Sequence, residues 1–376
     1  MSKINVRSPY FINFKAPNLT SAILEIKIYR GSASSSWGGS PDYTLNTTAV
    51  EEHITFEIAE LIKDFIPAEF NGTYAGENNN TTMYVDYRIT KYISNVAQTP
   101  EDTLGVRAFY GYGFFEDGSN PQFLQGYLQS NTTILKSDDD ALRVPVDNEN
   151  TMSVTFLNKG EQIYVWTPIA GINIQDQLQY VSTASSGVDN YRDRVEISGG
   201  TFEDNSCIQE FLRNETIYPV DEVIINAVEG VTVLRIENIE ECKYTPYKLT
   251  FINKFGAYQD IWFFKNSKVA MNTNEEMYKS NIVSNGSYQT YDPQKKLLTK
   301  NGNQTLTVNS GYYPESYNEV FKQLFLSEKV WIEYNQQTLG VNIESKNINY
   351  KTSVTDGVIN YTIDVSFAFD TINNIR

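Results

Sequence analysis

Short segments in which apolar and polar residues alternate recur along most of the chain. Leu24, Ile26 and Ile28, for example, alternate with charged residues. A period of two is typical of a strand with one buried face, and turns rich in Gly, Asn and Pro separate such segments at intervals of roughly 10 residues. This spacing favours β-sandwich architecture. Further strands are predicted over 54–58, 83–89, 106–115, 152–157, 162–166 and 329–334.

The most regular alternation runs from Ile359 to Phe369, where apolar residues occupy every second position. The residues between them are Asn360, Thr362, Asp364, Ser366 and Ala368. It predicts a strand with one firmly buried face. We expect this strand to be the second arm of a hairpin around Thr355-Asp356-Gly357. Another hairpin is predicted around Glu229-Gly230, because glycine supplies the positive φ of a tight turn. The arms of this other hairpin are 222–226 and 231–237.

Two segments have helical rather than alternating spacing. Apolar residues between Ile58 and Phe65 predict a short helix that stops before Pro67. A longer helix is predicted over 314–327, because Pro314 can begin a helix without losing a hydrogen bond. One face of that helix is apolar at the i, i+3, i+4, i+7 and i+8 positions, which predicts burial. These positions are Tyr317, Val320, Phe321, Leu324 and Phe325.

The predicted fold class is mostly β, with several domains along the 376 residues. We expect an N-terminal β-sandwich over 1–145, a middle β-rich domain over 151–245, and a C-terminal β-module over 246–376 that carries the helix 314–327. The middle and C-terminal segments could also form one unit. Pro145 and the polar residues after it predict a linker over 143–150. The aromatic segments 247–256 and 260–265 are predicted core strands, and 182–190 is a predicted loop.

Composition adds to this picture through aromatic residues and charge. The chain has 26 Tyr and 20 Phe against 4 Trp, and Tyr suits both pleated surfaces and subunit interfaces. Its formal net charge of −16 and the absence of a basic run argue against nucleic-acid binding. The dense acidic tract Asp138–Asp140 is expected in a solvated loop.

No apolar run approaches the roughly 20 residues of a membrane helix, and the start has no apolar leader segment. A soluble product of the cytoplasm, without membrane insertion, is therefore expected. Cys207 and Cys242 are the only cysteines, too few for a zinc site. Two separate buried thiols are the expected arrangement, and a disulfide between them stays open.

Motifs for catalysis or cofactor binding are absent from the sequence. His53 is the single histidine, which excludes His-His metal clusters, and we expect it at a surface or strand edge. Gly111-Tyr112-Gly113 lacks the third glycine of a dinucleotide fingerprint and is expected to open an aromatic strand. We therefore predict no catalytic, cofactor-binding or metal residues and no enzymatic activity. A carboxylate pair of the kind that cleaves glycosides stays open as a possibility, because the distance between the two carboxyl groups in space decides it. The sequence does not give that distance.

Several segments resemble tail and baseplate structural proteins of tailed bacteriophages that infect Bacteroidetes, the flavobacterial or crAss-like phages. They are Asn309-Ser310-Gly311-Tyr312-Tyr313-Pro314, Leu326-Ser327-Glu328, Val330-Trp331-Ile332, 359–363, 251–256 with 262–264, and, more weakly, 5–10. The resemblance implies a virion structural protein, a subunit of a tail, baseplate or neck ring. It also implies a tail-tube-like C-terminal module, a homo-oligomeric ring, with a hexamer or dodecamer expected, and neighbouring tail or neck proteins as partners.

An alternative is a carbohydrate-binding or receptor-binding adhesin module, since exposed aromatic residues and Asn-rich loops also suit that role. Under the first interpretation, the helix from Pro314 and the strand from Ile359 to Phe369 are where we expect the assembly fold.

Overall fold

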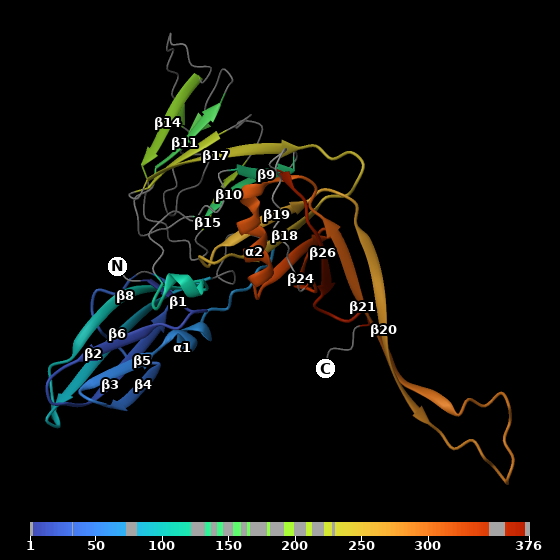
Figure 1. Cartoon of the computed structure of the whole chain (residues 1–376), viewed down its shortest axis with the longest axis horizontal. Coiled ribbons are helices and arrows are strands. Elements are labelled where there is room, and N and C mark those ends of the chain that lie inside the picture. The colour runs from blue at the N-terminus through green and yellow to red at the C-terminus, as the bar shows by residue number, and fades with distance from the viewer. Residues whose placement is uncertain are drawn as a thin grey trace. The chain divides into compact units, whose positions relative to one another are not determined.

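The computed structural model describes residues 3–31, 33–72, 81–121, 132–136, 141–145, six strands between 153 and 227, 230–345 and 358–372. The chain is mostly β, as predicted, with two α-helices among these residues (Figure 1). Contacts group it into two units. Unit 1 is Met1–Glu240, Thr250–Ile261 and Ser316–Glu328, and unit 2 is Glu241–Leu249, Trp262–Glu315 and Lys329–Arg376. The predicted division at 145 and 246 stays a prediction.

Unit 1 begins with a sheet in the order β1-β8-β6-β3-β4, with β7 beside β6. A separate pair, β2 and β5, is antiparallel, and α1 follows β5. The strands are β1 (Lys3–Asn5), β2 (Phe11–Lys15), β3 (Leu19–Tyr29), β4 (Tyr43–Thr48), β5 (His53–Glu57), β6 (Thr82–Ile93), β7 (Val96–Ala97) and β8 (Glu101–Phe109), and α1 is Ala59–Lys63.

The alternation along β3 and β5 is confirmed, because their apolar residues are buried and the residues between them are more exposed. In β3, Leu24 and Ile26 are fully buried. The short helix is also confirmed, with Ile62 buried on its inner face. Burial of each such side chain contributes about 1.5–3 kcal/mol to folding.

The predicted strand 106–115 is wrong at its end, because β8 stops at Phe109 and Gly111 lies in a loop. A tertiary contact causes this. The backbone at Gly111 approaches the carbonyl oxygen of Lys254 so closely that a Cβ there would lie 2.5 Å from it. The next residue, Tyr112, donates its backbone N–H to the same oxygen at 2.8 Å.

The middle of unit 1 contains three further sheets. One has the order β14-β11-β16-β17-β9, and the pairs β10-β15 and β12-β13 form the others. The strands are β9 (Thr132–Lys136), β10 (Ala141–Pro145), β11 (Ser153–Asn158), β12 (Tyr164–Val165), β13 (Gln179–Tyr180), β14 (Arg192–Ser198), β15 (Ile208–Leu212), β16 (Glu222–Ala227) and β17 (Gly230–Ile239).

The arms of the hairpin predicted around Glu229-Gly230 are confirmed, since β16 and β17 pair from Glu222 opposite Arg235 to Ala227 opposite Gly230. Gly230 is the first residue of β17, and the two residues before it lie outside the described residues. Residues 143–145 were predicted to begin a linker, which is wrong, because they belong to β10 and Pro145 lies opposite Ile208. A two-stranded pair consists of edge strands only, where proline is tolerated. Residues 146–150, the loop 182–190, Asp138–Asp140 and Cys207 lie outside the described residues.

The largest sheet has the order β19-β18-β23-β24-β26-β21-β20, and its last five strands belong wholly to unit 2. The short strands β22 and β25 pair separately. The strands are β18 (Tyr247–Ile252), β19 (Tyr258–Phe263), β20 (Lys268–Lys279), β21 (Lys295–Asn309), β22 (Tyr313–Pro314), β23 (Val330–Tyr334), β24 (Gln337–Ile343), β25 (Val358–Ile359) and β26 (Thr362–Phe367).

In this sheet the buried face predicted for 359–369 is confirmed up to Phe367, whereas Phe369 is about half exposed. The aromatic segments assigned to β18 and β19 are buried as predicted. The turn at 355–357 lies outside the described residues.

The helix predicted over 314–327 is confirmed as α2 (Asn318–Leu326), which follows a 3₁₀ turn at Glu315–Tyr317. Pro314 instead ends β22, so the helix begins later than predicted. Tyr317, Val320, Phe321 and Leu324 are buried, and Phe325 is half-buried. In its contacts α2 belongs to unit 1, although the strands on both sides of it in the sequence belong to unit 2.

Candidate functional site: the Glu328 cluster and an exposed hairpin arm

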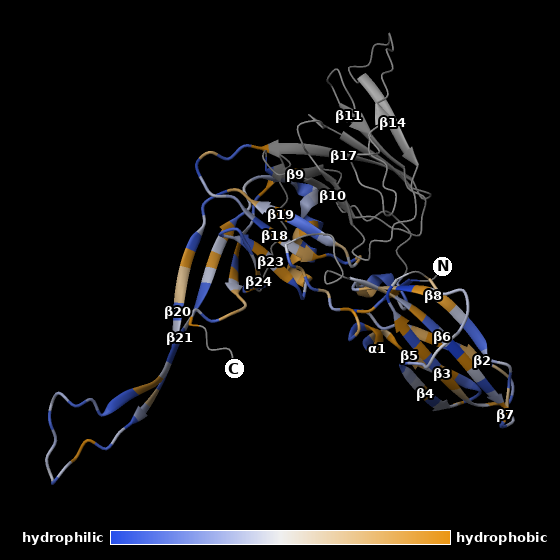
Figure 2. Ribbon diagram, turned by 180° about the vertical axis from the view of Figure 1, so that it is seen from behind, coloured by the Kyte–Doolittle hydropathy of each residue, from blue (hydrophilic) through white to orange (hydrophobic). Residues whose placement is uncertain are grey.

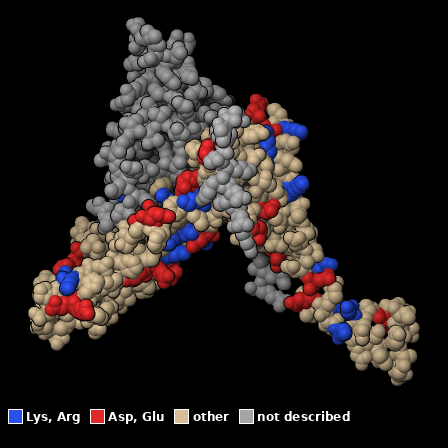
Figure 3. Space-filling model, in the orientation of Figure 1, with Lys and Arg blue, Asp and Glu red and all other residues tan. Residues whose placement is uncertain are grey.

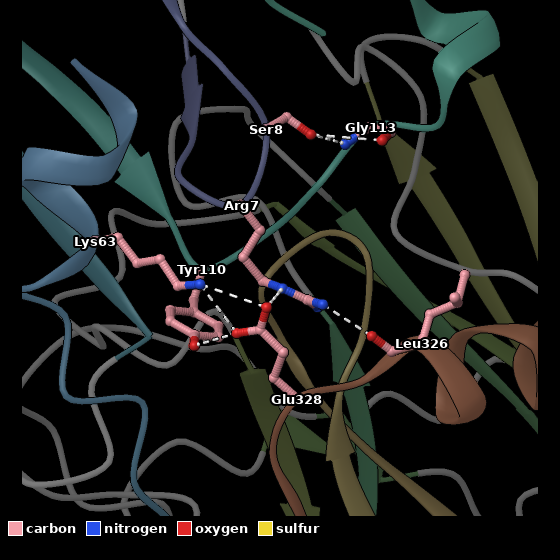
Figure 4. Close-up of polar contacts among 7 residues, drawn as sticks. All are labelled: Arg7, Ser8, Lys63, Tyr110, Gly113, Leu326 and Glu328. Carbon is pink, nitrogen blue, oxygen red and sulfur yellow. Dashed lines mark hydrogen bonds and ion pairs between the residues drawn. The ribbon is translucent and has the colours of Figure 1, made fainter. Parts of the chain in front are cut away.

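Four charged or polar side chains of unit 1 meet just beyond the end of α2 (Figure 4). We call Arg7, Lys63, Tyr110 and Glu328 the Glu328 cluster. Arg7 Nε lies 3.2 Å and Lys63 Nζ 3.1 Å from the Glu328 carboxylate. The Tyr110 hydroxyl donates a hydrogen bond to that carboxylate at 2.8 Å. Arg7 also donates through Nη2 to the carbonyl oxygen of Leu326 at 2.8 Å, which satisfies an end carbonyl of the helix.

Local structure places each member of the Glu328 cluster. Arg7 follows β1, Lys63 is the last residue of α1, and Tyr110 follows β8 directly. The turn after Arg7 is held to the loop after β8, because the Ser8 hydroxyl accepts the backbone N–H of Gly113 at 2.8 Å (Figure 4). The cluster therefore joins the segments after β1 and β8 and the last residue of α1 to the end of α2.

A second set of contacts binds the loop between β18 and β19 to α2. The backbone N–H of Lys254 donates to the side-chain oxygen of Gln323 at 2.9 Å, and Gln323 is fully buried. Gln323 in turn donates to Glu319 at 2.9 Å. Lys322 lies 3.6 Å from the ring centre of Phe114, at cation–π distance.

The electrostatics of the Glu328 cluster favour one protonation state. Burial raises the pKa of Glu328, but hydrogen bonds from Tyr110 and Lys63 and the charges of Arg7 and Lys63 outweigh it, so the pKa is lowered overall. Burial, together with the adjacent carboxylate, raises the pKa of Tyr110. Glu328 is thus an ion held by cations and a hydroxyl donor, an arrangement that fixes geometry and makes the carboxylate a weak base.

Replacement of Glu328 by glutamine should destabilise unit 1 by about 1 kcal/mol at neutral pH, since the carboxylate is 44% exposed and its ion pairs are partly screened. A lowered folded-state pKa gives stability that is present above the unfolded pKa and is lost as pH falls through the folded pKa. The difference in urea midpoint between wild type and E328Q should therefore shrink below about pH 4. E101Q, which removes one exposed ion pair with Lys91, is the control. A difference that does not change with pH would contradict the assignment.

The second feature is a two-stranded hairpin in unit 2, residues 268–300, which we call the arm. It consists of β20, the connection 280–294 and the first part of β21, and it extends as a narrow ribbon (Figures 1 and 2). All twelve residues of β20 are exposed. β20 is also the last strand in the sheet order, so its outer edge has no strand partner among the described residues.

The arm is closed by a turn that its sequence favours. Ser284 and Ser287 exchange two backbone hydrogen bonds, of 2.9 and 3.1 Å, around Asn285 and Gly286. Both central residues have positive φ, 50° at Asn285 and 77° at Gly286. Positive φ at both positions defines the type I′ turn that Asn-Gly prefers, whose twist matches that of the flanking strands.

The two faces of the arm differ in polarity. Val269 pairs with the fully buried Leu306, so its face continues the buried face of the sheet. The Glu275–Lys300 ion pair, 3.2 Å, lies between directly opposed residues of this face. We call this side the apolar face, and its apolar members, each exposed by 51–54%, are Val269, Met271, Met277 and Leu297. The opposite, polar face carries Ala270, Asn272, Asn274 and Glu276, together with the half-exposed ring of Tyr278.

The arm also differs from the rest of the chain in charge. It contains five lysines and three carboxylates, a net charge of +2, whereas the whole chain carries −16. Figure 3 shows basic side chains along this ribbon at the lower right. The other residues together therefore carry −18.

The sequence pattern missed both features. The Glu328 cluster unites residues far apart in the chain, and no local pattern connects them. In the arm the sequence had one usable signal, Asn285-Gly286 between two segments of β-forming residues.

His53 lies exposed at the head of β5, as expected. Cys242 is exposed, so its expected burial is wrong. In the described part of the chain no cluster of His, Cys, Asp or Glu could hold a metal ion.

Neither protein-family models nor curated proteins give a match to this chain. None of the helices in the described ranges is both long and apolar enough to cross a bilayer.

Proposed function

We propose that this protein is a structural subunit that assembles with copies of itself, as a ring component of a phage tail, baseplate or neck. The arm is the observation that carries the proposal. An isolated two-stranded hairpin is only marginally stable in water, and a long open edge is a site for pairing. Contact with a neighbouring subunit would stabilise the hairpin and cover its open edge. The placement in a virion rests on the sequence resemblance alone.

Several general properties support a packing role. The described chain presents sheets with polar faces rich in Asn and Thr, which suit hydrated subunit contacts. The cluster around Glu328 and the contacts of Gln323 give unit 1 a fixed internal geometry. A subunit that must repeat in a closed ring needs such a rigid body, because small errors accumulate around the ring.

Native mass spectrometry and electron microscopy of the purified full-length chain test the proposal. We expect a closed homo-oligomer, with six or twelve copies indicated by the phage resemblance. A chain that remains monomeric up to high micromolar concentration would contradict it.

An adhesin role is the second candidate, and the end of the arm favours it. Tyr288 and Tyr291 are 64% and 79% exposed there, beside polar residues, as in surfaces that stack on sugars. A glycan array separates the two roles. Binding that is lost in Y288A/Y291A, from a chain that does not form rings, would favour the adhesin.

A further inference from the structure

We infer that the arm docks through its apolar face onto an acidic surface of a second copy of this chain, while its polar face stays in water. The inference rests on the proposed self-assembly and specifies the surface that makes it. It starts from the continuity of the apolar face with the buried face of the sheet. Beyond Leu306 the same face runs on through Val269 and Met271 with about half of each side chain in water.

Apolar residues return to this face beyond the Glu275–Lys300 ion pair, at Met277 and Leu297. A bulge shifts the pairing so that Glu276 lies opposite Thr299 and Met277 opposite Leu297. The extra residue on β21 places Leu297 on the same side as Met277, each being about half exposed. Without the shift, Met277 would lie opposite Leu298, and Leu297 would lie on the other face. The bulge thus brings Leu297 onto the face of Met277, where both side chains are about half exposed.

The charge of the arm indicates which surface it binds. Lys279 pairs with Lys295 just beyond Met277 and Leu297, on the same face. Neither lysine forms an ion pair with another described residue, and like charges directly opposite each other are unfavourable unless a partner neutralises them. A suitable partner therefore offers an apolar surface rimmed by carboxylates. The remainder of this chain carries −18, so a second copy supplies that complement.

Two double variants with the same change in charge test the choice of face. M271E/M277E places carboxylates on the apolar face, and N272E/N274E places them on the polar face. All four positions are exposed, so both variants should keep the wild-type unfolding transition. We expect M271E/M277E to weaken assembly at least tenfold by analytical ultracentrifugation, and N272E/N274E to assemble as wild type does. Equal assembly by both variants, or equal loss by both, would overturn the inference.

A charge test and a mixing test examine the partner. K279E/K295E should weaken assembly, and added salt should weaken wild-type assembly more than that of the variant. M271E/M277E keeps the receiving surface, so mixing it with wild type should reduce the yield of complete oligomers, whereas N272E/N274E should not.

If K279E/K295E assembles normally, the inferred acidic surface on the partner is wrong. Assembly of wild type that none of these changes affects would overturn the inference but leave the proposed function standing, whereas a monomeric wild type would overturn both.

Discussion

Replacement of Val365 by aspartate is expected to prevent stable folding of the unit 2 sheet. Val365 is 0% exposed and lies between Leu306 on β21 and Ile343 on β24. A carboxylate there finds no water, and burial of an unpaired charge is among the few changes that cost more than about 4 kcal/mol. That is a large part of the roughly 5–15 kcal/mol that holds a domain together. Thermal denaturation followed by circular dichroism, together with limited proteolysis, measures the loss.

Thr362→Asp is the matched control for this charge. Thr362 lies on the same strand but is exposed, and its hydroxyl accepts a hydrogen bond from Asn309 that a carboxylate can also accept. Its cost should stay within about 0.5 kcal/mol. If both variants unfold alike, the alternation of buried and exposed positions on β26 is not what stabilises the sheet.

The second large effect is expected on α2. Phe321→Ala should destabilise unit 1 by about 3–5 kcal/mol, because Phe321 is 0% exposed and its removal leaves a cavity. Urea denaturation of the full chain gives the change in midpoint. Because α2 groups with unit 1, the transition that shifts should be the one in which unit 1 unfolds.

Phe325→Ala provides the comparison on the same helix with the same chemistry. Phe325 is half-buried, and its truncation should cost about 1 kcal/mol. Phe321→Leu should recover most of the loss, since it restores apolar volume. A larger effect of F325A than of F321A would show that the helix packs through a different face from the one described.

The sequence predicted those elements whose cause lies within a few residues. Apolar residues alternate along β3 and β26 and form a stripe on α2. Each pattern predicts one buried face, and the structure buries that face. The predicted strand end at Phe115 was wrong because the chain turns at Gly111 to meet Lys254, more than a hundred positions later. The linker predicted at Pro145 was wrong because this proline lies in the two-stranded pair of β10 and β15. Whether a strand lies at an edge depends on distant parts of the chain and is not visible in the nearby sequence.

The candidate sites were harder to predict from the sequence, for related physical reasons. Glu328 has three partners from three distant parts of the chain, and each of them looks like an ordinary surface residue in the sequence. In the arm the contrast between faces is weak, since Ala270 and Asn272 alternate with Val269 and Met271 over only four positions before Thr273. The assembly fold expected at the helix and the strand near the end of the chain stays a prediction, and the structure shows an exposed arm between residues 268 and 300.

The separation of Tyr110 and Glu328 by 218 positions also has a consequence for biosynthesis. At roughly 5–20 residues per second, Glu328 leaves the ribosome on the order of 10–40 s after Tyr110. The sandwich strands around Tyr110 can pair during that interval, but the side chains that later bind Glu328 and the end of α2 remain without these partners. Completion of unit 1 is thus a late, non-local step of translation, and such contacts fold slowly.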